Sequence, residues 1–335
     1  MDSMYDIYGL GNALVDMEYV VDHDFLQRHG IAKGHMTLVD EARIDALTAL
    51  LEELRPERMS GGSAANTIIA AEGFGATTYY SCKLADDATG AYFLEDLGAF
   101  GVATNANALA DNGKSGRCLV LVTPDAERSM STFLGISSNL SIADVDEAAL
   151  ANSKYFYVEG YLSSSPESLE AAVACRELAQ RERVQTAVTL SDPSMVELFR
   201  DNLTRMLGNG VDHLFCNEEE ALSWAKTDRL DVAINELKDI ARVLNITLGA
   251  RGSLAITRSA RHEVAAFPTN VIDTNGAGDI YAGACLYGWC VGMESVQAAS
   301  FANFAAANLV AQYGARLKNM NDYRSVLARF KTTND

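Results

Sequence analysis

The segment DTNGAGD, residues 273–279, is followed directly by a run of small and apolar residues. If a helix begins near Ala277, the backbone N–H groups of Gly276, Ala277 and Gly278 have no partner inside it and lie at the positive end of its dipole. Such a helix terminus binds anions, and glycines let a ligand approach the backbone closely. Asp279 would then lie in the first turn, beside the anion.

Asp279 has two interpretations. As a general base it would accept a proton from a hydroxyl group, while the neighbouring N–H groups stabilise a phosphoryl group in transfer. As a structural residue it would complement the helix dipole, which is worth a few tenths to about 1 kcal/mol. The segment alone leaves both interpretations open.

A second glycine-rich segment, GGSAAN, occupies residues 61–66 and precedes a run typical of a helix. Gly61 and Gly62 would let the backbone approach a polar ligand, and Ser63 and Asn66 would supply hydrogen bonds to it. The alternative is a simple glycine turn followed by a serine cap.

Asn12 and Asp16 come shortly after an apolar run, residues 5–10, that predicts the first strand. A buried carboxylate at position 16 would accept hydrogen bonds from two vicinal hydroxyl groups of a sugar. A loop-capping aspartate is the alternative. The segment GLGNAL, residues 9–14, has Leu14 where a dinucleotide-binding fingerprint needs its third glycine, so a nicotinamide oxidoreductase is disfavoured.

The composition of the chain is that of a globular protein with an acidic surface. It has 335 residues, of which 48% are hydrophobic and 21% charged, and its formal net charge is −18. Because such a surface repels phosphate backbones and anionic lipids, nucleic acid and membranes are not expected partners. The expected partners are small molecules, and the oligomeric state is left open between a monomer and a homodimer.

The six cysteines show no spacing typical of a metal site, so zinc is not expected and reduced core thiols are. The N-terminal segment is acidic and does not resemble a signal peptide. No run of about 18 apolar residues predicts a membrane span. These features favour a cytoplasmic location.

Apolar runs of strand length alternate with helical stretches along most of the chain. This alternation predicts an α/β fold with a mostly parallel central sheet covered by helices on both faces. Strands are expected at residues 5–10, 77–84, 154–162, 184–190 and 212–217, and helices at 64–75, at 88–101 and in two small-residue stretches from 276 onward.

Two regions interrupt this alternation. Residues 17–22 and 35–40 are short β-like pieces, and residues 117–135 predict a hairpin with its turn in PDAER, residues 124–128. Together these pieces would form a small sheet separate from the main one.

The pair of motifs GGSAAN and DTNGAGDIYAGA resembles the paired motifs of the ribokinase (PfkB) family of carbohydrate and nucleoside kinases, and the resemblance extends over nearly the whole chain. Within this family, residues 11–26, residues 61–67 and Asn275 are similar to the branch that acts on adenosine. The resemblance implies a three-layer α/β/α domain with a mostly parallel sheet, made of residues 1–13, 62–112 and 136–335. A small β lid would comprise residues 14–61 and 113–135.

The resemblance also implies a role for each motif residue. Asp279 would be the base that activates the acceptor hydroxyl. The backbone N–H groups of the anion hole would belong to Gly276, Ala277 and Gly278. The residues that hold the ribose hydroxyls would be Asp16, Asn12, Gly62, Ser63 and Asn66.

On the nucleotide side, Asn217 and Glu220 match an N-x-x-E element that the family ties to magnesium and phosphate. Glu220 would act on the metal indirectly, and a solvated acid at a helix start is its alternative role. Thr247, Gly249 and Gly252, in TLGARG, match the loop on the nucleotide side.

Each of three further residues has two possible roles, between which the sequence does not decide. Asn303 would lie near the adenine of ATP, or it is a polar residue of helix packing. Arg128 matches a lid arginine that reaches the phosphates, or it is an exposed turn residue. Phe133 is the candidate aromatic for stacking on a purine base, or it packs in the core.

The reaction implied is transfer of phosphate from ATP, with Mg²⁺, to the primary 5′-hydroxyl of adenosine, giving AMP. A monovalent cation such as K⁺ near Asp273 is a further expectation. A kinase acting on a free sugar, such as ribose or fructose, is the alternative, and an apolar lid pocket would favour the nucleoside. A sugar- or nucleotide-binding regulator without turnover is a third hypothesis, which an intact Asp279 disfavours.

Overall fold

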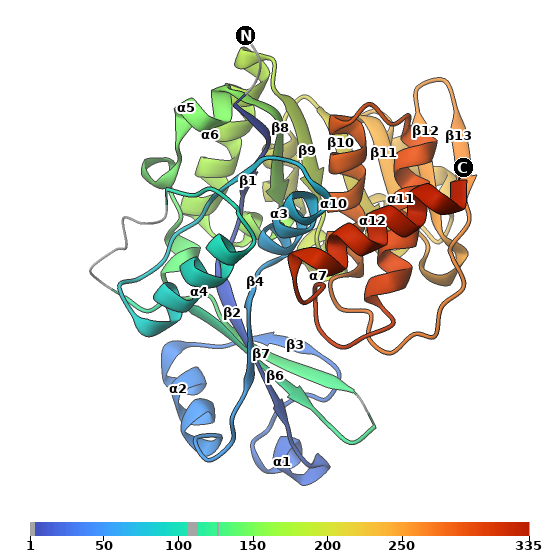
Figure 1. Ribbon diagram of the computed structural model, residues 1–335. Coiled ribbons are helices and arrows are strands. Elements are labelled where there is room, and N and C mark those ends of the chain that lie inside the picture. Colours follow the sequence, from blue (N-terminus) through green and yellow to red (C-terminus); the bar gives the residue numbers. More distant parts are fainter. Residues whose placement is uncertain (1–3, 106–112, 126, 335) are drawn as a thin grey trace.

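The computed structural model describes residues 4–105, 113–125 and 127–334, and it contains two sheets joined by chain segments that run from one to the other (Figure 1). The larger sheet has eight strands in the order β13-β12-β11-β10-β9-β8-β1-β5. Its strands are β1 (Tyr5–Leu10), β5 (Thr78–Ser81), β8 (Ser153–Glu159), β9 (Gln185–Thr189), β10 (Val211–Asn217), β11 (Ala241–Thr247), β12 (Ser253–Thr257) and β13 (Arg261–Val264). All pairs are parallel except those of β12 and β13 at one edge.

Both faces of the larger sheet are buried. Side chains of successive residues on a strand point to opposite faces, so each strand contributes to two separate cores. On β8, Tyr155 and Tyr157 belong to one apolar core, whereas Phe156 and Val158 belong to the other. A sheet with two buried faces needs a helical layer on each, and the architecture is therefore three-layered, as the sequence predicts.

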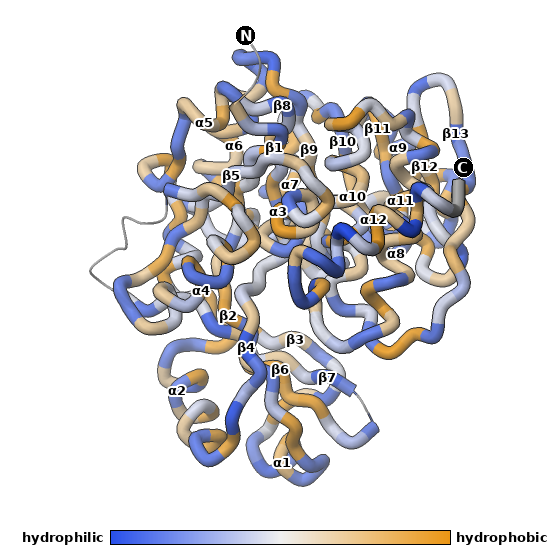
Figure 2. Tube along the Cα trace, viewed as in Figure 1, coloured by the Kyte–Doolittle hydropathy of each residue, from blue (hydrophilic) through white to orange (hydrophobic). Residues whose placement is uncertain are grey.

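The helices divide between these two layers. One layer packs around α10 and borders the small sheet through α4; it consists of α3 (Ser63–Phe74), α4 (Ala88–Ala99), α10 (Ala277–Cys290), α11 (Ser295–Leu309) and α12 (Met320–Asn334). The other layer consists of α5 (Glu147–Ala151), α6 (Pro166–Glu182), α7 (Pro193–Leu207), α8 (Glu218–Ala225) and α9 (Leu230–Leu237). Stretches of the outer helix α12 are hydrophilic, whereas apolar residues concentrate in the strands and in the helices beneath it (Figure 2).

The small sheet has five strands in the order β3-β7-β6-β2-β4. They are β2 (Leu14–Val20), β3 (Met36–Leu38), β4 (Glu57–Gly61), β6 (Gly116–Val122) and β7 (Arg128–Phe133). All five fall within the segments that the sequence assigns to a lid, and β6 and β7 form the expected hairpin, of whose turn Ala126 lies outside the described residues.

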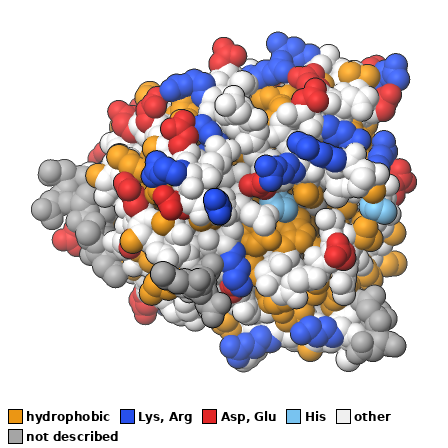
Figure 3. Space-filling model, turned by 90° about the horizontal axis from the view of Figure 1, so that it is seen from above, with side chains coloured by type: hydrophobic (Ala, Val, Ile, Leu, Met, Phe, Trp, Pro, Cys, Tyr) orange, Lys and Arg blue, Asp and Glu red, His pale blue; other side chains and the backbone are white. Residues whose placement is uncertain are grey.

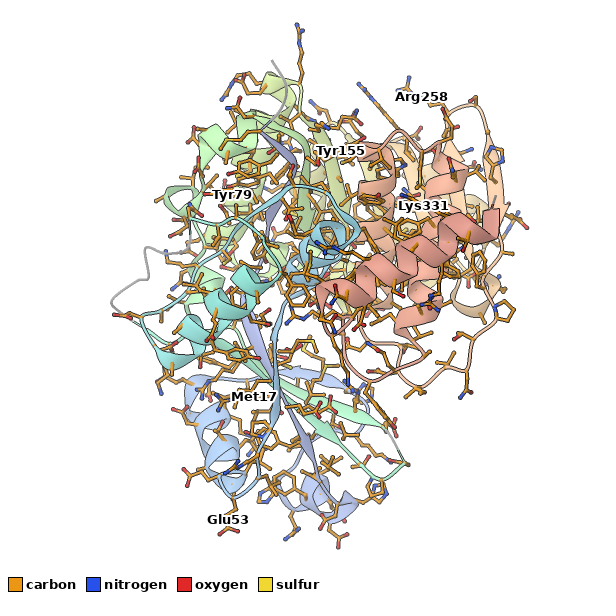
Figure 4. The ribbon with its side chains drawn as sticks, in the orientation of Figure 1. Met17, Glu53, Tyr79, Tyr155, Arg258 and Lys331 are labelled. Carbon is orange, nitrogen blue, oxygen red and sulfur yellow. The ribbon has the colours of Figure 1, made fainter. Side chains whose placement is uncertain are left out.

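Two helices, α1 (His23–Arg28) and α2 (Glu41–Leu50), cover one face of the small sheet. Met17 of β2 shares an apolar core with Ile44 and Leu47 of α2. Figure 4 places Met17 within this sheet and Glu53 at its outer end, far from the larger sheet. Because β2 alternates, Asp16 lies on the other face, which is turned toward the larger sheet.

Some expected elements are longer than the observed ones. The strand predicted at residues 154–162 ends at Glu159, where a short 3-10 helix, Gly160–Ser164, begins. Likewise, β5 ends at Ser81 although the apolar run continues to residue 84. The apolar residues beyond these ends are buried in loops, so their hydrophobicity reports burial and not strand pairing.

Among the described residues, no helix is both long and apolar enough to span a membrane. Seen from the end opposite the small sheet, charged side chains of both signs are interspersed around an apolar area (Figure 3). The excess of acidic residues is therefore not concentrated on this face.

Candidate active site

A cavity of about 480 Å³ lies between the carboxyl ends of the large sheet's strands and the uncovered face of the small sheet. Ligands of open α/β sheets bind at this end of the strands. The predicted site residues on its wall are Asn12, Asp16, Gly62, Ser63, Asn66, Asn217, Glu220, Thr247, Gly249, Gly276, Ala277, Gly278 and Asp279. Motifs distant in the sequence therefore meet in one place.

Asp279 lies in the first turn of α10, which begins at Ala277. Ser63 donates a hydrogen bond of 2.7 Å to its Oδ1, and Asn66 Nδ2 donates one of 3.1 Å to its Oδ2. Burial raises the pKa of Asp279 to about 6, while these two hydrogen bonds act to lower it. Its carboxylate is thus held in one orientation, with a proton affinity suited to exchange near neutral pH.

The start of α10 requires glycine at position 276. Gly276 has a φ of 72°, and a Cβ atom there would collide with the carbonyl group of Ala315. The N–H groups of Gly276 and Gly278 have no hydrogen-bond partner within the described part of the chain, whereas that of Ala277 donates to the Thr274 carbonyl at 3.2 Å. Two of the three predicted donors are therefore free to bind an anion.

Asp273 holds the loop that precedes α10. Its Oδ1 accepts the Asn275 N–H at 3.1 Å and its Oδ2 accepts the Gly314 N–H at 2.8 Å. The first carboxylate of the motif therefore organises the backbone around the anion hole, and the second, Asp279, faces the cavity.

Asp16 lies on β2, opposite Met59 of β4, and its carboxylate covers Gly61 so closely that any side chain at position 61 would displace it. Burial raises the pKa of Asp16 to about 7, and the positive charges of Arg316 and Arg128 oppose this shift. The glycine at position 61 thus provides space for the carboxylate.

Glu159, a residue that the sequence analysis did not identify, connects the segment of Asn12 with the GGSAAN motif. Its Oε1 accepts hydrogen bonds of 2.8 Å from both Asn12 N and Asn12 Nδ2, and its Oε2 accepts one of 2.6 Å from the Ala64 N–H at the start of α3. It is fully buried on the cavity wall, and burial raises its pKa to about 7. An acid at the end of an otherwise apolar strand is the signal that could have identified it.

Asn217 and Glu220 form the capping box of α8. The Asn217 side chain accepts the Glu220 N–H at 2.8 Å, and the Glu220 carboxylate accepts both the Asn217 N–H at 3.2 Å and its Nδ2 at 2.6 Å. Burial raises the pKa of Glu220 to about 8. The element caps a helix and also lines the cavity, so Glu220 is buried and is not the solvated acid that was its alternative role.

A second cavity of about 450 Å³ adjoins the first and shares Thr247, Gly249, Ala277 and Gly278 with it. Gly252 and Asn303 line this second cavity and not the first. Further apolar residues on its wall are Phe267, Pro268, Val271 and Val310.

Asn303 has the packing role that was one of its two predicted alternatives, and its position near the adenine of ATP stays a prediction. Its Nδ2 donates to the Val264 carbonyl at 2.9 Å and to the Ala265 carbonyl at 3.2 Å, which fastens α11 to the end of β13. It also lines the second cavity, so it is a packing residue with one side turned toward a ligand site.

Arg128 does not lie on the wall of either cavity. It is the first residue of β7, its side chain is 11% exposed, and it pairs with Glu18 at 2.8 Å and with Asp273 at 3.1 Å. It is therefore not an exposed turn residue, and it joins the small sheet to the loop of the anion hole.

The prediction that Phe133 stacks on a base is wrong for this structure. Its neighbours Thr132 and Leu134 line the cavity, but Phe133 packs against the apolar core on the opposite side. The alternation of β7 explains this, because Met130 and Thr132 share one face and Phe133 occupies the other. The apolar residues that the small sheet and its flanking segments present to the cavity are Leu14, Met36, Leu38, Cys118, Met130 and Leu134.

No cluster of three or more His, Cys, Asp or Glu side chains with metal-binding geometry occurs among residues 4–105, 113–125 and 127–334. A magnesium ion that arrives with a nucleotide needs only one or two protein carboxylates, since phosphates and water supply its other ligands. Glu220 is one acidic side chain on the cavity wall.

Comparison with known proteins places these features in a family. Residues 34–322 match the model of the pfkB family carbohydrate kinases. The chain is 26% identical to adenosine kinase 2 of Arabidopsis thaliana over 338 residues, which covers 92% of this chain and 95% of that protein.

Two solved structures are similar over almost their whole length. A probable sugar kinase from Rhizobium etli CFN 42 has a TM-score of 0.90 and 30% identity and covers 99% of both chains. The adenosine kinase from Sinorhizobium meliloti has a TM-score of 0.89 and 33% identity and covers 97% of this chain and 99% of that one. The fold is ribokinase-like, as expected, and the chain belongs to the pfkB family of carbohydrate kinases, here a nucleoside or sugar kinase.

Proposed function

We propose that this chain transfers the γ-phosphoryl group of ATP to the 5′-hydroxyl of adenosine, forming AMP and ADP. The observation that carries the proposal is the position of Asp279. Its partly buried carboxylate is held by Ser63 and Asn66 at the start of α10, on the same cavity wall as the free N–H groups of Gly276 and Gly278. A base and an anion hole in one helix start are what phosphoryl transfer to a hydroxyl requires.

In the proposed reaction, Asp279 accepts the proton of the acceptor hydroxyl as the hydroxyl oxygen bonds to the γ-phosphorus. The bond between the γ-phosphorus and the bridging oxygen breaks, and ADP leaves with that electron pair. The N–H groups of Gly276 and Gly278 stabilise the negative charge on the phosphoryl oxygens. Since burial raises the pKa of Asp279 only to about 6, most molecules carry the ionised base at pH 7.

The second cavity is the proposed site of the ATP base and ribose. It adjoins the anion hole through Ala277 and Gly278, and Thr247 and Gly249 line both cavities. Asn303 and Gly252 would contact the nucleoside part of ATP.

Kinases of this family use ATP and Mg²⁺. Magnesium, when bound, would neutralise charge on the phosphates, and Glu220 with Asn217 would hold it through its hydration shell. A monovalent cation near Asp273 remains a proposal. Arg128 would have to leave its pair with Asp273 to reach the phosphates.

The chemistry of the lid wall favours a nucleoside over a free sugar. Opposite the catalytic wall the cavity is bounded mainly by apolar side chains, those of Leu14, Met36, Leu38, Cys118 and Met130. Among the described lid residues that line the cavity, the one hydroxyl is that of Thr132, which already donates to Cys118 Sγ at 3.2 Å. Thioether and aliphatic groups pack well on a flat aromatic ring. Asp16 lies on the same sheet and would accept hydrogen bonds from the two vicinal ribose hydroxyls.

Residues 14–61 and 113–135 would act as a lid that closes over the acceptor and excludes water from the phosphate. The six cysteines are free thiols, and five of them are buried, which supports the proposal of a reducing, cytoplasmic location.

The test is an acceptor screen with Mg-ATP, in which ADP release is measured with adenosine, other nucleosides, ribose and fructose. The proposal predicts that adenosine gives the highest kcat/KM and that AMP is the product. Stimulation by a free sugar alone would show a sugar kinase instead. If no acceptor stimulates ADP release, the assignment of kinase activity to this site is wrong.

A further inference from the structure

A buried arginine, Arg316, lies on the segment between α11 and α12 and belongs to none of the motifs described above. Its side chain is 4% exposed, forms an ion pair with Asp96 of α4 and lies over the ring of Phe100, with 4.7 Å between the guanidinium carbon and the ring centroid. A positive charge is therefore fixed inside the protein by an anion on one side and an aromatic face on another.

Contacts join this arginine to the strand beside Asp16. Asp96 Oδ2, which accepts from Arg316, also accepts the backbone N–H of Ser60 at 2.8 Å. Ser60 precedes Gly61, over which the Asp16 carboxylate lies. The guanidinium, its counter-ion and the acceptor-side carboxylate are thus linked along one short path.

The same segment also contacts the anion hole. Gly314 donates to Asp273, and the carbonyl group of Ala315 packs against Gly276. Residues 314–316 therefore touch both the phosphate side and the acceptor side of the cavity, and Arg316 is the charged member.

Two nitrogen atoms of the Arg316 guanidinium are unpaired among the described residues. Its Nε and Nη1 are buried and have no hydrogen-bond partner in the described part of the chain. Buried charged donors without partners are unfavourable for folding, so the positive charge of this guanidinium is only partly compensated by Asp96.

Four charged groups act on Asp16, and one thiol faces it across the sheet. Arg316 and Arg128 favour its ionised form, Asp279 and Glu18 disfavour it, and the Cys118 thiol lies opposite it on β6. Burial raises the pKa of Asp16 to about 7, and among the charges that oppose burial Arg316 has the largest effect.

We propose that Arg316 is a positioning residue of the acceptor site, whose guanidinium, fixed by Asp96 and Phe100 beside the strand that carries Gly61, favours the ionised form of the Asp16 carboxylate. An ionised carboxylate accepts hydrogen bonds from two vicinal hydroxyls, whereas a protonated one presents a donor to one of them. Arg316 therefore sets the affinity for the acceptor without touching the acceptor, ATP or Asp279. The inference rests on the proposed function, in which Asp16 binds the acceptor sugar.

The first test compares Arg316→Gln and Arg316→Lys with the wild type in steady-state kinetics across pH. If the pKa of Asp16 rises by one unit, Gln should raise the acceptor KM roughly fivefold at about pH 7, and the difference should shrink toward about pH 9. The kcat value should stay near that of the wild type, and Lys should restore most of the acceptor affinity.

Arg176→Gln is the matched control, since Arg176 is an equally buried arginine on α6 that lines neither cavity. An acceptor KM unchanged by Arg316→Gln, or raised equally at every pH, would overturn the proposal, because the second result is that of a purely structural role.

A second test needs no substrate. The carboxyl ¹³C signal of Asp16, assigned by its loss in Asp16→Asn, is titrated in the ligand-free protein. Arg316→Gln should raise the pKa of Asp16, and Asp96→Asn, which removes the counter-ion and leaves the arginine, should lower it. The Asp96 variant tests the predicted direction of the change in the Asp16 pKa even if Arg316→Gln does not fold. An Asp16 pKa that does not move in either folded variant contradicts the proposal, whereas a failed acceptor screen would contradict only the proposed function.

Discussion

Ser63 donates a hydrogen bond of 2.7 Å to Asp279 across a separation of 216 residues in the chain. This bond joins the first turns of α3 and α10, whose N-termini converge on the same cavity. Two helix N-termini directed at one point add partial positive charge to a cavity whose wall also carries four acidic side chains. The carboxylate of Asp279, from the second glycine-rich motif, accepts hydrogen bonds from Ser63 and Asn66 of the first.

The first prediction concerns the pH dependence of turnover. A base must be deprotonated to accept a proton, and burial raises the pKa of Asp279 to about 6. With saturating substrates, kcat should therefore rise with pH through about 6 and level off above it. Since Asp16 has a pKa of about 7, kcat/KM for the acceptor should continue to rise at higher pH than kcat does. A kcat that is flat from about pH 5 to about pH 8 would contradict this assignment.

The second prediction concerns stability. The pKa of Asp279 is raised above its usual value of 3.8, so the folded chain binds this proton more tightly than the unfolded chain. The resulting stabilisation is present at low pH and is lost as the pH rises through about 6. Asp279→Asn removes this effect, so the variant should gain free energy of unfolding relative to the wild type between about pH 4.5 and about pH 7.5. Urea unfolding of both proteins at the two pH values measures the difference in their free energies of unfolding. If Asp279→Asn instead loses free energy of unfolding relative to the wild type as the pH rises, the prediction is wrong.

The third prediction uses a pair of glycines. Gly276→Ala should destabilise the fold by about 1–3 kcal/mol and remove activity, because position 276 has a positive φ and no space for a Cβ atom. Gly98→Ala on α4 is the matched control, since nothing lies within 4 Å of the place that a Cβ atom would take there and alanine favours a helix. Thermal unfolding of both variants tests this, and equal melting temperatures would contradict the strain at position 276.

The fourth prediction concerns the acceptor base. Met130→Gln keeps the size of the side chain but makes the lid wall polar, so it should raise the adenosine KM about tenfold, on the scale of burying one apolar side chain. The same change should leave the KM for ATP unaltered. Leu50→Gln on α2, a residue that is 51% exposed, is the control within the small sheet's own helices. An unchanged adenosine KM would remove Met130 from the base site.

Much of the fold was predictable from the sequence because its signals are local. The apolar run at residues 5–10 coincides with β1, and Gly276 marks the start of α10 at Ala277. The hairpin of β6 and β7 and the separate small sheet follow from runs of β-forming residues with a turn between them. The roles of the motif residues stay predictions until variants are measured.

Other features depend on tertiary packing, which local patterns do not encode. Phe133 and Met130 lie on one strand, and only the pairing of that strand decides which of them faces the cavity. Glu159 connects Asn12 to α3 through contacts between segments far apart in sequence. Arg316 has no motif around it, and its burial against Asp96 is visible only in the folded chain.

The most direct test of the central claim is the turnover of Asp279→Asn beside its binding of acceptor and nucleotide. The variant should bind adenosine and ATP with near wild-type affinity in calorimetry, while kcat falls by at least roughly 10²-fold, the scale of general-base catalysis. Asp146→Asn is the control, because Asp146 caps α5 away from both cavities. Turnover of Asp279→Asn close to that of the wild type would contradict the assignment of Asp279 as the base.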